Sequence, residues 1–222
     1  DRFKIPSFWK KKSIISFFLL PFSIFYYLGY LTYRLSKKEV EIGKPVLCVG
    51  NLVIGGAGKT PLVIRIRQLL SRDYSTIFVL TRGYLGKNKG PLIVKKTMHF
   101  QDVGDESLIH ANFGSTCVSK NKVEGAKLCK KNGADLIILD DGLQSINVKK
   151  KMSLLVIDSF YGTKNRFIFP SGPLRQPTKD ALELCDAIII LDKNFTKKKY
   201  EFVSHKNIYT CLLYTSDAAD EV

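Results

Sequence analysis

A glycine-rich segment from Gly50 to Thr60, with the sequence GNLVIGGAGKT, is the feature that most restricts how this chain can fold. It follows an apolar run that predicts a strand, and it leads into a predicted helix that begins at Lys59. Glycine-rich backbone before a helix N-terminus turns N–H groups toward an anion, and the helix dipole favours the same charge. Lys59 is then placed for the β- and γ-phosphates of a nucleotide, and the Thr60 hydroxyl for Mg²⁺. The segment therefore predicts a phosphate-binding loop.

The match to the usual phosphate-loop pattern is incomplete, because G-x-x-x-x-G-K-[ST] has glycine where Val53 stands. The GKT core agrees, as does its position between a strand and a helix. A structural glycine turn is the alternative interpretation. The residues expected to contact nucleotide phosphate in this loop are Gly55, Gly56, Ala57, Gly58, Lys59 and Thr60.

From Lys44 onward, short apolar runs alternate with polar stretches of helical character. The predicted strands are Pro45–Val49, Thr76–Leu80, Leu92–Lys95, Asp135–Leu139, Leu154–Ile157 and Ala187–Leu191. The predicted helices are Lys59–Leu70, Glu106–Ala111, Asn121–Lys131 and Thr178–Leu184. Continuously apolar strands are typical of parallel sheets covered on both faces. We therefore expect an α/β fold with a doubly wound, mostly parallel sheet like that of the P-loop nucleoside triphosphatases.

A second motif, Asp140-Asp141-Gly142, follows the apolar run LIIL. In P-loop enzymes a metal-associated aspartate lies at the carboxyl end of a neighbouring strand, close to the phosphates. Asp-Gly is also a strong turn signal, so a plain turn is the alternative. Because a phosphate loop is predicted in the same chain, we favour a Mg²⁺ site formed by Thr60, Asp140 and Asp141.

The run from Ser13 to Tyr33 has no charged residue and has basic residues on both sides. A helix of this length can cross a bilayer. Pro21 and Gly29 interrupt the run, and its many aromatic side chains suit the headgroup layer, so a helix lying in the interface competes with a full span. A buried core helix is the third possibility. We expect association with a membrane, and not a signal peptide, because no cleavage site follows.

Charge and cysteine content narrow the classes of partner. The chain has 222 residues with 35 Lys+Arg and 20 Asp+Glu, a formal net charge of +15 that predicts an anionic partner. Basic and aromatic residues do not interleave as they do in RNA-binding proteins, which disfavours nucleic acid. Five cysteines without a C-x-x-C pair argue against a disulfide framework and a zinc module. The histidines also lack the spacing of metal ligands.

Taken together, the motifs resemble those of the tetraacyldisaccharide 4′-kinase family, the lipid A kinases of Gram-negative bacteria. The similar segments are VGNL-x-x-GG-x-GKTP (Val49–Pro61), RGY (Arg82–Tyr84), GDE (Gly104–Glu106), DDGLQ (Asp140–Gln144) and P-x-GPLR (Pro170–Arg175). An N-terminal hydrophobic helix belongs to the same pattern. The resemblance implies transfer of phosphate from ATP, with Mg²⁺, to the 4′-hydroxyl of tetraacyldisaccharide 1-phosphate, giving lipid IVA. It also implies a location on the cytoplasmic face of the inner membrane.

The resemblance further assigns roles to single residues. It implies that Asp105 activates the sugar hydroxyl, with Glu106 beside it in the active site and Lys59 on the phosphates. The nucleotide site would also be lined by Arg82, Tyr84 and Arg175. Without the resemblance, GDE reads as a helix cap followed by first-turn acid. The implied partners are the lipid substrate and an anionic membrane surface, with no nucleic acid and no obligate protein partner.

Several positions depart from the family pattern. Ser145 stands where a histidine is usual, Gln176 replaces an acid, and Lys120 or Lys122 occupies the place of an arginine. Lysine keeps the charge and loses the bidentate fork. These departures bear on substrate affinity and turnover more than on nucleotide binding. Another P-loop ATPase or GTPase, and a non-catalytic membrane-tethered nucleotide-binding module, are the alternative functions.

Four segments are expected along the chain. They are an N-terminal hydrophobic helix (1–38), a P-loop kinase domain (39–195), the start of a C-terminal lobe (196–210) and a non-native tail (211–222). The tail resembles the translation of a transposase adapter used in sequencing libraries, and a natural acidic tail is the alternative. After a lysine-rich chain it contains no basic residue and three acidic ones.

Overall fold

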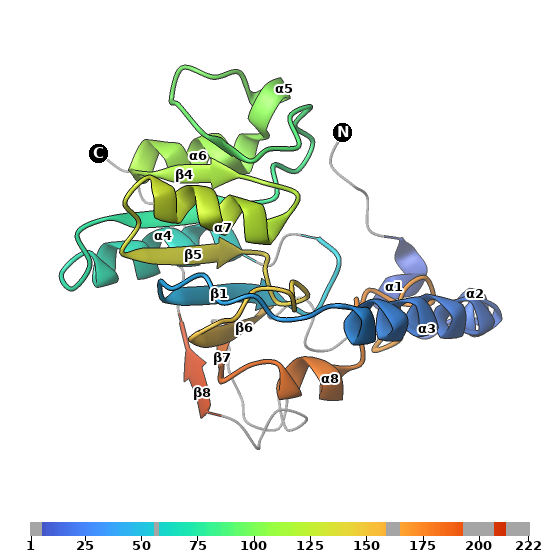
Figure 1. Ribbon diagram of the computed structural model, residues 1–222. Helices are drawn as coiled ribbons and strands as arrows, with labels where there is room; N and C mark the ends of the chain where they lie inside the picture. Colours follow the sequence, from blue (N-terminus) through green and yellow to red (C-terminus); the bar gives the residue numbers. More distant parts are fainter. Residues whose placement is uncertain (1–5, 56–57, 159–164, 193–206, 212–222) are drawn as a thin grey trace, which may run out of the picture.

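The computed structural model of the chain describes residues 6–55, 58–158, 165–192 and 207–211. An eight-stranded sheet lies at its centre, with the strand order β3-β4-β2-β5-β1-β6-β7-β8 (Figure 1). The strands are β1 (Val46–Asn51), β2 (Ile77–Thr81), β3 (Leu92–Ile93), β4 (Thr116–Val118), β5 (Leu136–Asp140), β6 (Met152–Asp158), β7 (Ala187–Leu191) and β8 (Asn207–Thr210). All neighbouring strands are parallel except β3 and β4. The predicted mostly parallel α/β sheet is confirmed.

Strand β1 lies near the middle of the sheet because both of its faces are apolar. Val46 and Cys48 belong to the core formed with helices α7 (Lys122–Lys131) and α8 (Thr178–Glu183). The alternate residues Leu47 and Val49 belong to the core formed with helix α4 (Lys59–Leu70) on the opposite face. Since successive side chains of a strand point to opposite faces, a continuously apolar strand needs cover on both. The carboxyl end of β1 is thereby fixed between two layers of helices.

The described elements differ from the predicted ones mainly where they are short. Strands β4 and β8 were not predicted, because each has only three or four residues and includes polar side chains. Strand β3 is limited to two residues of the predicted Leu92–Lys95. Helix α6 (Asp105–Phe113) is longer than predicted at both ends, and a short helix α5 (Phe100–Val103) precedes it. Helix α4 has the predicted bounds.

Three N-terminal helices lie along the segment 165–180. They are α1 (Ser7–Lys10), α2 (Ile14–Phe18) and α3 (Leu20–Ser36). The Trp9 indole N–H donates to the Pro170 carbonyl at 3.0 Å, and the buried Ser23 hydroxyl donates to Ser171 at 2.7 Å. Further along α3, the Tyr27 hydroxyl donates to the Asp180 carboxylate at 3.0 Å. A polar seam thus joins the N-terminal helices to the later part of the chain.

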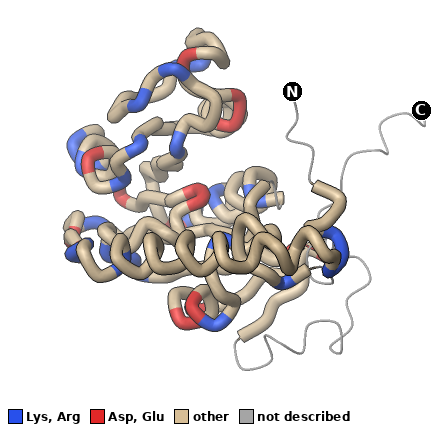
Figure 2. The backbone as a smooth tube through the Cα atoms, turned by 90° about the vertical axis from the view of Figure 1, so that its right-hand side faces the viewer, with Lys and Arg blue, Asp and Glu red and all other residues tan. Residues whose placement is uncertain are grey.

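The outer side of α2 and α3 is apolar and exposed. In Figure 2 the two helices lie at the front and carry few charged positions. The exposed apolar side chains of this outer face are Ile14, Ile15, Phe17, Phe18, Phe22, Ile24, Phe25, Leu28, Tyr33 and Leu35. The run is not one continuous helix: α2 ends before Leu19 and α3 begins at Leu20, because Pro21 in the first turn of α3 has no backbone N–H to continue the helical hydrogen bonds. In the described part of the chain, no helix combines the length and apolarity needed for crossing a membrane. A buried core helix is also excluded by the exposure.

Candidate active site

The phosphate-binding loop joins β1 to α4 at the carboxyl edge of the sheet. Gly58, directly before the helix, has a φ of +67°, a conformation that glycine adopts without steric cost. The Asn51 side-chain amide donates to the Gly55 carbonyl at 3.1 Å, which closes the loop on itself. Gly56 and Ala57 lie outside the described residues. Helix α4 starts at Lys59, so its N-terminal amides face this loop and form an anion site.

The segment 170–176 pairs with the other side of the loop. Ile54 N–H donates to the Pro173 carbonyl at 2.9 Å, and Arg175 N–H donates to the Leu52 carbonyl at 2.9 Å. The GPLR motif is therefore a strand-like brace for the glycine-rich loop. This brace places the Arg175 side chain beside the phosphate-binding loop.

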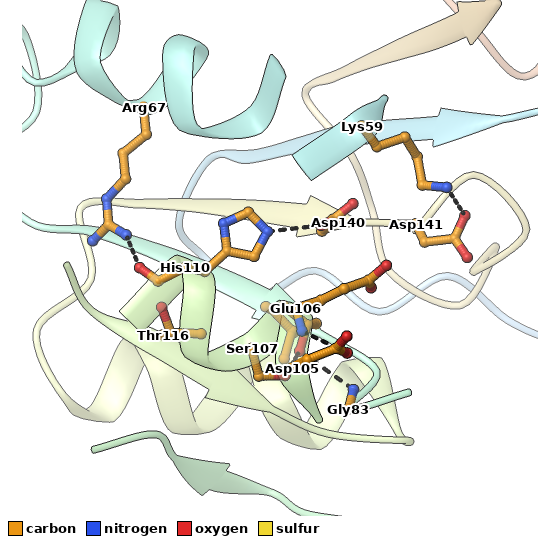
Figure 3. Close-up of polar contacts among 12 residues, drawn as sticks. Lys59, Arg67, Gly83, Asp105, Glu106, Ser107, His110, Thr116, Asp140 and Asp141 are labelled. Carbon is orange, nitrogen blue, oxygen red and sulfur yellow. Dashed lines mark hydrogen bonds and ion pairs between the residues drawn. The ribbon is translucent and has the colours of Figure 1, made fainter. Parts of the chain in front are cut away.

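Asp141 lies between two cations that come from separate loops. One carboxylate oxygen is 3.5 Å from Lys59 Nζ, and the other accepts a hydrogen bond from Arg175 at 2.9 Å (Figure 3 shows the lysine contact). Burial acts to raise the Asp141 pKa, but the charges of Lys59 and Arg175 outweigh it and lower the pKa below its usual range. Asp141 also has a φ of +58°. Such positions concentrate at functional sites.

Asp140, at the end of β5, has two carboxylate oxygens in different situations. Oδ2 lies 2.8 Å from the Nε2 nitrogen of the buried His110. Oδ1 is buried and has no hydrogen-bond partner in the described part of the chain. An orphaned buried carboxylate oxygen is a suitable ligand for a hard cation such as Mg²⁺. Proteins hold Mg²⁺ by one or two carboxylates together with substrate phosphates, which fits Thr60 and Asp140 beside a phosphate loop.

Asp105 and Glu106 form the first turn of α6, which lies on the same side as the aspartate pair (Figure 3). The Asp105 carboxylate accepts a hydrogen bond from the Glu106 backbone N–H at 2.9 Å. Gly104 is the N-cap residue, without a side-chain cap, and Asp105 and Glu106 are the first-turn acids, so the geometry also fits the alternative in which GDE serves the helix start. Partial burial, followed by the charge of Asp140, raises the pKa of Glu106. The negative charge of Asp140 therefore acts on the Glu106 carboxyl.

The sequence pattern left two candidates, Lys120 and Lys122, for the position of the family arginine, and the structure separates them. Lys120 is exposed, whereas the Lys122 side chain is buried under the carboxyl edge of the sheet. Its Nζ donates to the Leu80 carbonyl at 3.1 Å and approaches the Asp140 carbonyl at 3.5 Å. Burial lowers the Lys122 pKa from 10.5 to about 8, although Asp140 and Asp141 act in the opposite direction. Lys122 supports the strand ends and does not face solvent.

Arg82 and Tyr84 are exposed in the loop after β2. This loop packs on the start of α6, since a Cβ on Gly104 would lie 2.4 Å from the Tyr84 carbonyl oxygen. The RGY and GDE motifs are thus neighbours through their backbones. The structure does not bring either side chain into a hydrogen bond or an ion pair with the Lys59–Asp141–Arg175 cluster within the described residues.

Two residues that depart from the family pattern, Ser145 and Gln176, differ in their burial. Ser145 is partly exposed in the turn after Asp141. Gln176 is fully buried, and neither atom of its amide has a hydrogen-bond partner among the described residues. The sequence reasoning missed His110 as a partner of Asp140, because it searched the histidines for metal-ligand spacing only.

A parallel sheet in which a central strand leads through a glycine-rich loop to a helix, with a lysine and two aspartates at the same edge, defines a P-loop nucleotide-binding protein. The family model of tetraacyldisaccharide-1-P 4′-kinase matches residues 15–220. The chain belongs to this family.

Relatives and a solved structure agree with this membership. Tetraacyldisaccharide 4′-kinase of Rhodopseudomonas palustris strain HaA2 is 43% identical over 189 residues, covering 84% of this chain and 55% of the relative. The protein of the same name from Paramagnetospirillum magneticum is 39% identical over 195 residues, covering 86% and 59%. LpxK from Aquifex aeolicus, solved in complex with ATP, superposes with a TM-score of 0.75 at 27% identity, covering 89% of this chain and 64% of that one. The chain spans a little over half the length of these relatives.

The buried Lys122 predicts a pH dependence of stability. Because its pKa is lower in the folded than in the unfolded state, the unfolded chain binds more protons between about pH 8 and 10.5. Lys122 therefore makes folding more favourable as the pH rises through this window, by at most about 1.4 kcal/mol per pH unit. Urea unfolding at several pH values, for wild type and Lys122→Met, measures this contribution. The wild type should gain stability relative to the variant; parallel pH curves would refute the prediction.

Proposed function

We propose that this chain carries the nucleotide site of a kinase that transfers the γ-phosphate of ATP to the 4′-hydroxyl of tetraacyldisaccharide 1-phosphate. The observation that carries the proposal is the convergence of Lys59, Arg175 and the aspartate pair at the carboxyl edge of the sheet. The names of the similar proteins support the acceptor, and the ATP complex of the similar structure supports the donor. Lipid IVA is the product of such a transfer.

Nucleotide binding is assigned to the loop and the cations around it. The N-terminal amides of α4 and Lys59 bind the phosphates, and Arg175 adds a second cation from the brace. Thr60, Asp140 and Asp141 would hold Mg²⁺, which neutralises charge on the phosphates. Without nucleotide, Asp141 forms ion pairs with both Lys59 and Arg175. On nucleotide binding, a phosphate oxygen would replace the Asp141 carboxylate as the partner of Lys59. Arg82 and Tyr84 are proposed as outer contacts of the nucleotide.

The chemical step is assigned to the acids of α6. Asp105 accepts the proton of the 4′-hydroxyl while the hydroxyl oxygen attacks the γ-phosphorus in line, and ADP leaves. Asp105 is exposed at the first turn of the helix, where an acceptor can reach it. Desolvation, followed by the charge of Asp140, raises the pKa of Glu106, which we assign to the same active site as Asp105.

The apolar outer face of α2 and α3 is proposed as the attachment to the cytoplasmic face of the inner membrane. Large exposed apolar faces on soluble domains mark interaction sites, and basic residues flank this one on both sides. Helices that lie in the interface, instead of spanning it, fit the break at Leu19. An anionic lipid surface suits the net charge of +15.

The transfer reaction tests the proposed function directly. Labelled ATP and tetraacyldisaccharide 1-phosphate in detergent micelles should give a labelled lipid, and Lys59→Ala should reduce the rate about 100-fold, the effect of losing ~3 kcal/mol of transition-state stabilisation. Lys127→Ala is the matched control, because Lys127 is an exposed lysine on α7. If the wild type binds Mg·ATP and labels no lipid, the chain is a nucleotide-binding module instead.

The role of Asp105 has its own test. Asp105→Asn should lower kcat by about 10²–10⁴-fold, since a general base is lost, while the Kd for ATP stays the same. Asp73→Asn, at an exposed carboxylate outside the site, serves as the control. A variant that folds poorly and has normal kcat in its folded fraction would show that Asp105 serves the helix only.

Membrane attachment is tested by charge on the apolar face. Phe18→Glu combined with Phe25→Glu should release the chain from phosphatidylglycerol-containing vesicles in a flotation assay, lowering the vesicle partition constant at least about 100-fold, because the two buried phenylalanines together contribute ~3 kcal/mol or more. Both side chains are more than 70% exposed. Phe113→Glu, at an exposed phenylalanine on α6, should remain bound. Equal flotation of all three proteins would place the attachment elsewhere.

A further inference from the structure

His110 is buried completely and contacts Asp140 with one ring nitrogen. The distance from Nε2 to Oδ2 is 2.8 Å, and a carboxylate can only accept a hydrogen bond, so Nε2–H is the donor. The other nitrogen, Nδ1, has no partner in the described part of the chain. The single hydrogen bond to Asp140 is thus the polar contact of this ring.

That hydrogen bond decides which oxygen of Asp140 remains available. Oδ2 is engaged by His110, while Oδ1 is buried and unpaired among the described residues. The backbone of Asp140 is fixed independently, because β5 pairs with β1 and the residue lies opposite Val49. The remaining freedom is rotation of the carboxylate, and the imidazole restricts it.

The ring itself is held on a rigid support. The His110 carbonyl accepts from the Arg67 guanidinium of α4 at 3.5 Å, and Arg67 also donates to the Ile77 carbonyl at 2.8 Å (Figure 3). On the same helix as His110, Ser107 shares a hydrogen bond of 2.8 Å with Thr81 of β2. Helix α6 is therefore tied to both α4 and the sheet, and His110 cannot shift without breaking these contacts.

We propose that His110 is a positioning residue for the metal site: it fixes the Asp140 carboxylate so that Oδ1 alone is presented to the cation of Mg·ATP. The proposal rests on the proposed function, because it needs a metal–nucleotide site at Asp140. His110 is four residues after Glu106, so one helix carries the proposed acids in its first turn and the positioning imidazole in its second. Hydrogen-bond partners of metal ligands typically account for about 10–100-fold in metal affinity.

The test compares side chains that keep or lose the donor. Glutamine can place an amide N–H where the imidazole Nε2 lies, whereas asparagine is too short and leucine has no donor. Calorimetry on the whole chain gives the Kd for ATP with Mn²⁺ and the Kd for ATP in EDTA. His110→Leu and His110→Asn should weaken Mn·ATP binding about tenfold or more and leave binding of ATP in EDTA unchanged. His110→Gln should restore most of the affinity. Thermal unfolding of each variant, and the Mn²⁺ electron paramagnetic resonance spectrum, complete the set.

Each outcome decides the matter. If His110→Leu does not fold, the Gln and Asn pair still separates the positioned donor from mere polarity. Equal Mn·ATP affinity in all variants overturns the positioning role and leaves the proposed function standing. Equal loss of affinity with and without metal also overturns it, because His110 would then only support the fold. If Mn²⁺ has no effect on ATP binding by the wild type, there is no metal site at Asp140, and both the positioning role of His110 and the proposed function are refuted.

Discussion

The partly buried carboxylate of Asp141 is paired with two cations, and these ion pairs hold three segments together at one edge of the sheet. Lys59 comes from the phosphate loop, Arg175 from the brace and Asp141 from the turn after β5. Because the two cations lower its pKa, the carboxylate stays ionised over the physiological range. A nucleotide phosphate is a competing anion for the same two cations, so the resting structure is preorganised for it.

The sheet could be predicted well because most of its strands are continuously apolar, which indicates that both of their faces are buried. Runs such as LIIL and AIIIL have no polar residue, as is typical of strands in a parallel sheet covered on both faces. Strand β4 has the sequence TCV, and its place in the sheet comes from pairing with β2, which no local pattern contains. The break between α2 and α3, in contrast, has a local signal in Pro21, whereas the contacts of these helices have none. Ser16 and Ser23 lie in an apolar run, yet both turn inward to hydrogen-bond partners that are distant in sequence.

In the candidate site too, residues in local motifs could be predicted, whereas contacts between residues distant in sequence could not. Lys59, Thr60 and the aspartate pair could be predicted because local motifs carry them. The ion pair between Asp141 and Arg175 joins residues 34 positions apart, and the hydrogen bond between His110 and Asp140 spans 30. Neither follows from spacing along the chain. Lys122 was named as one of two candidates, and only its burial under the sheet separates it from Lys120.

The segment 165–176 has two sets of contacts whose combination has a geometric consequence. Its first half accepts hydrogen bonds from α1 and α3, and its second half pairs with the phosphate loop and carries Arg175. Under the proposed attachment of the outer face of α2 and α3 to lipid, this short stretch would set the distance between the phosphate site and the bilayer surface. The distance of an acceptor hydroxyl from the acyl chains would then contribute to the choice of substrate.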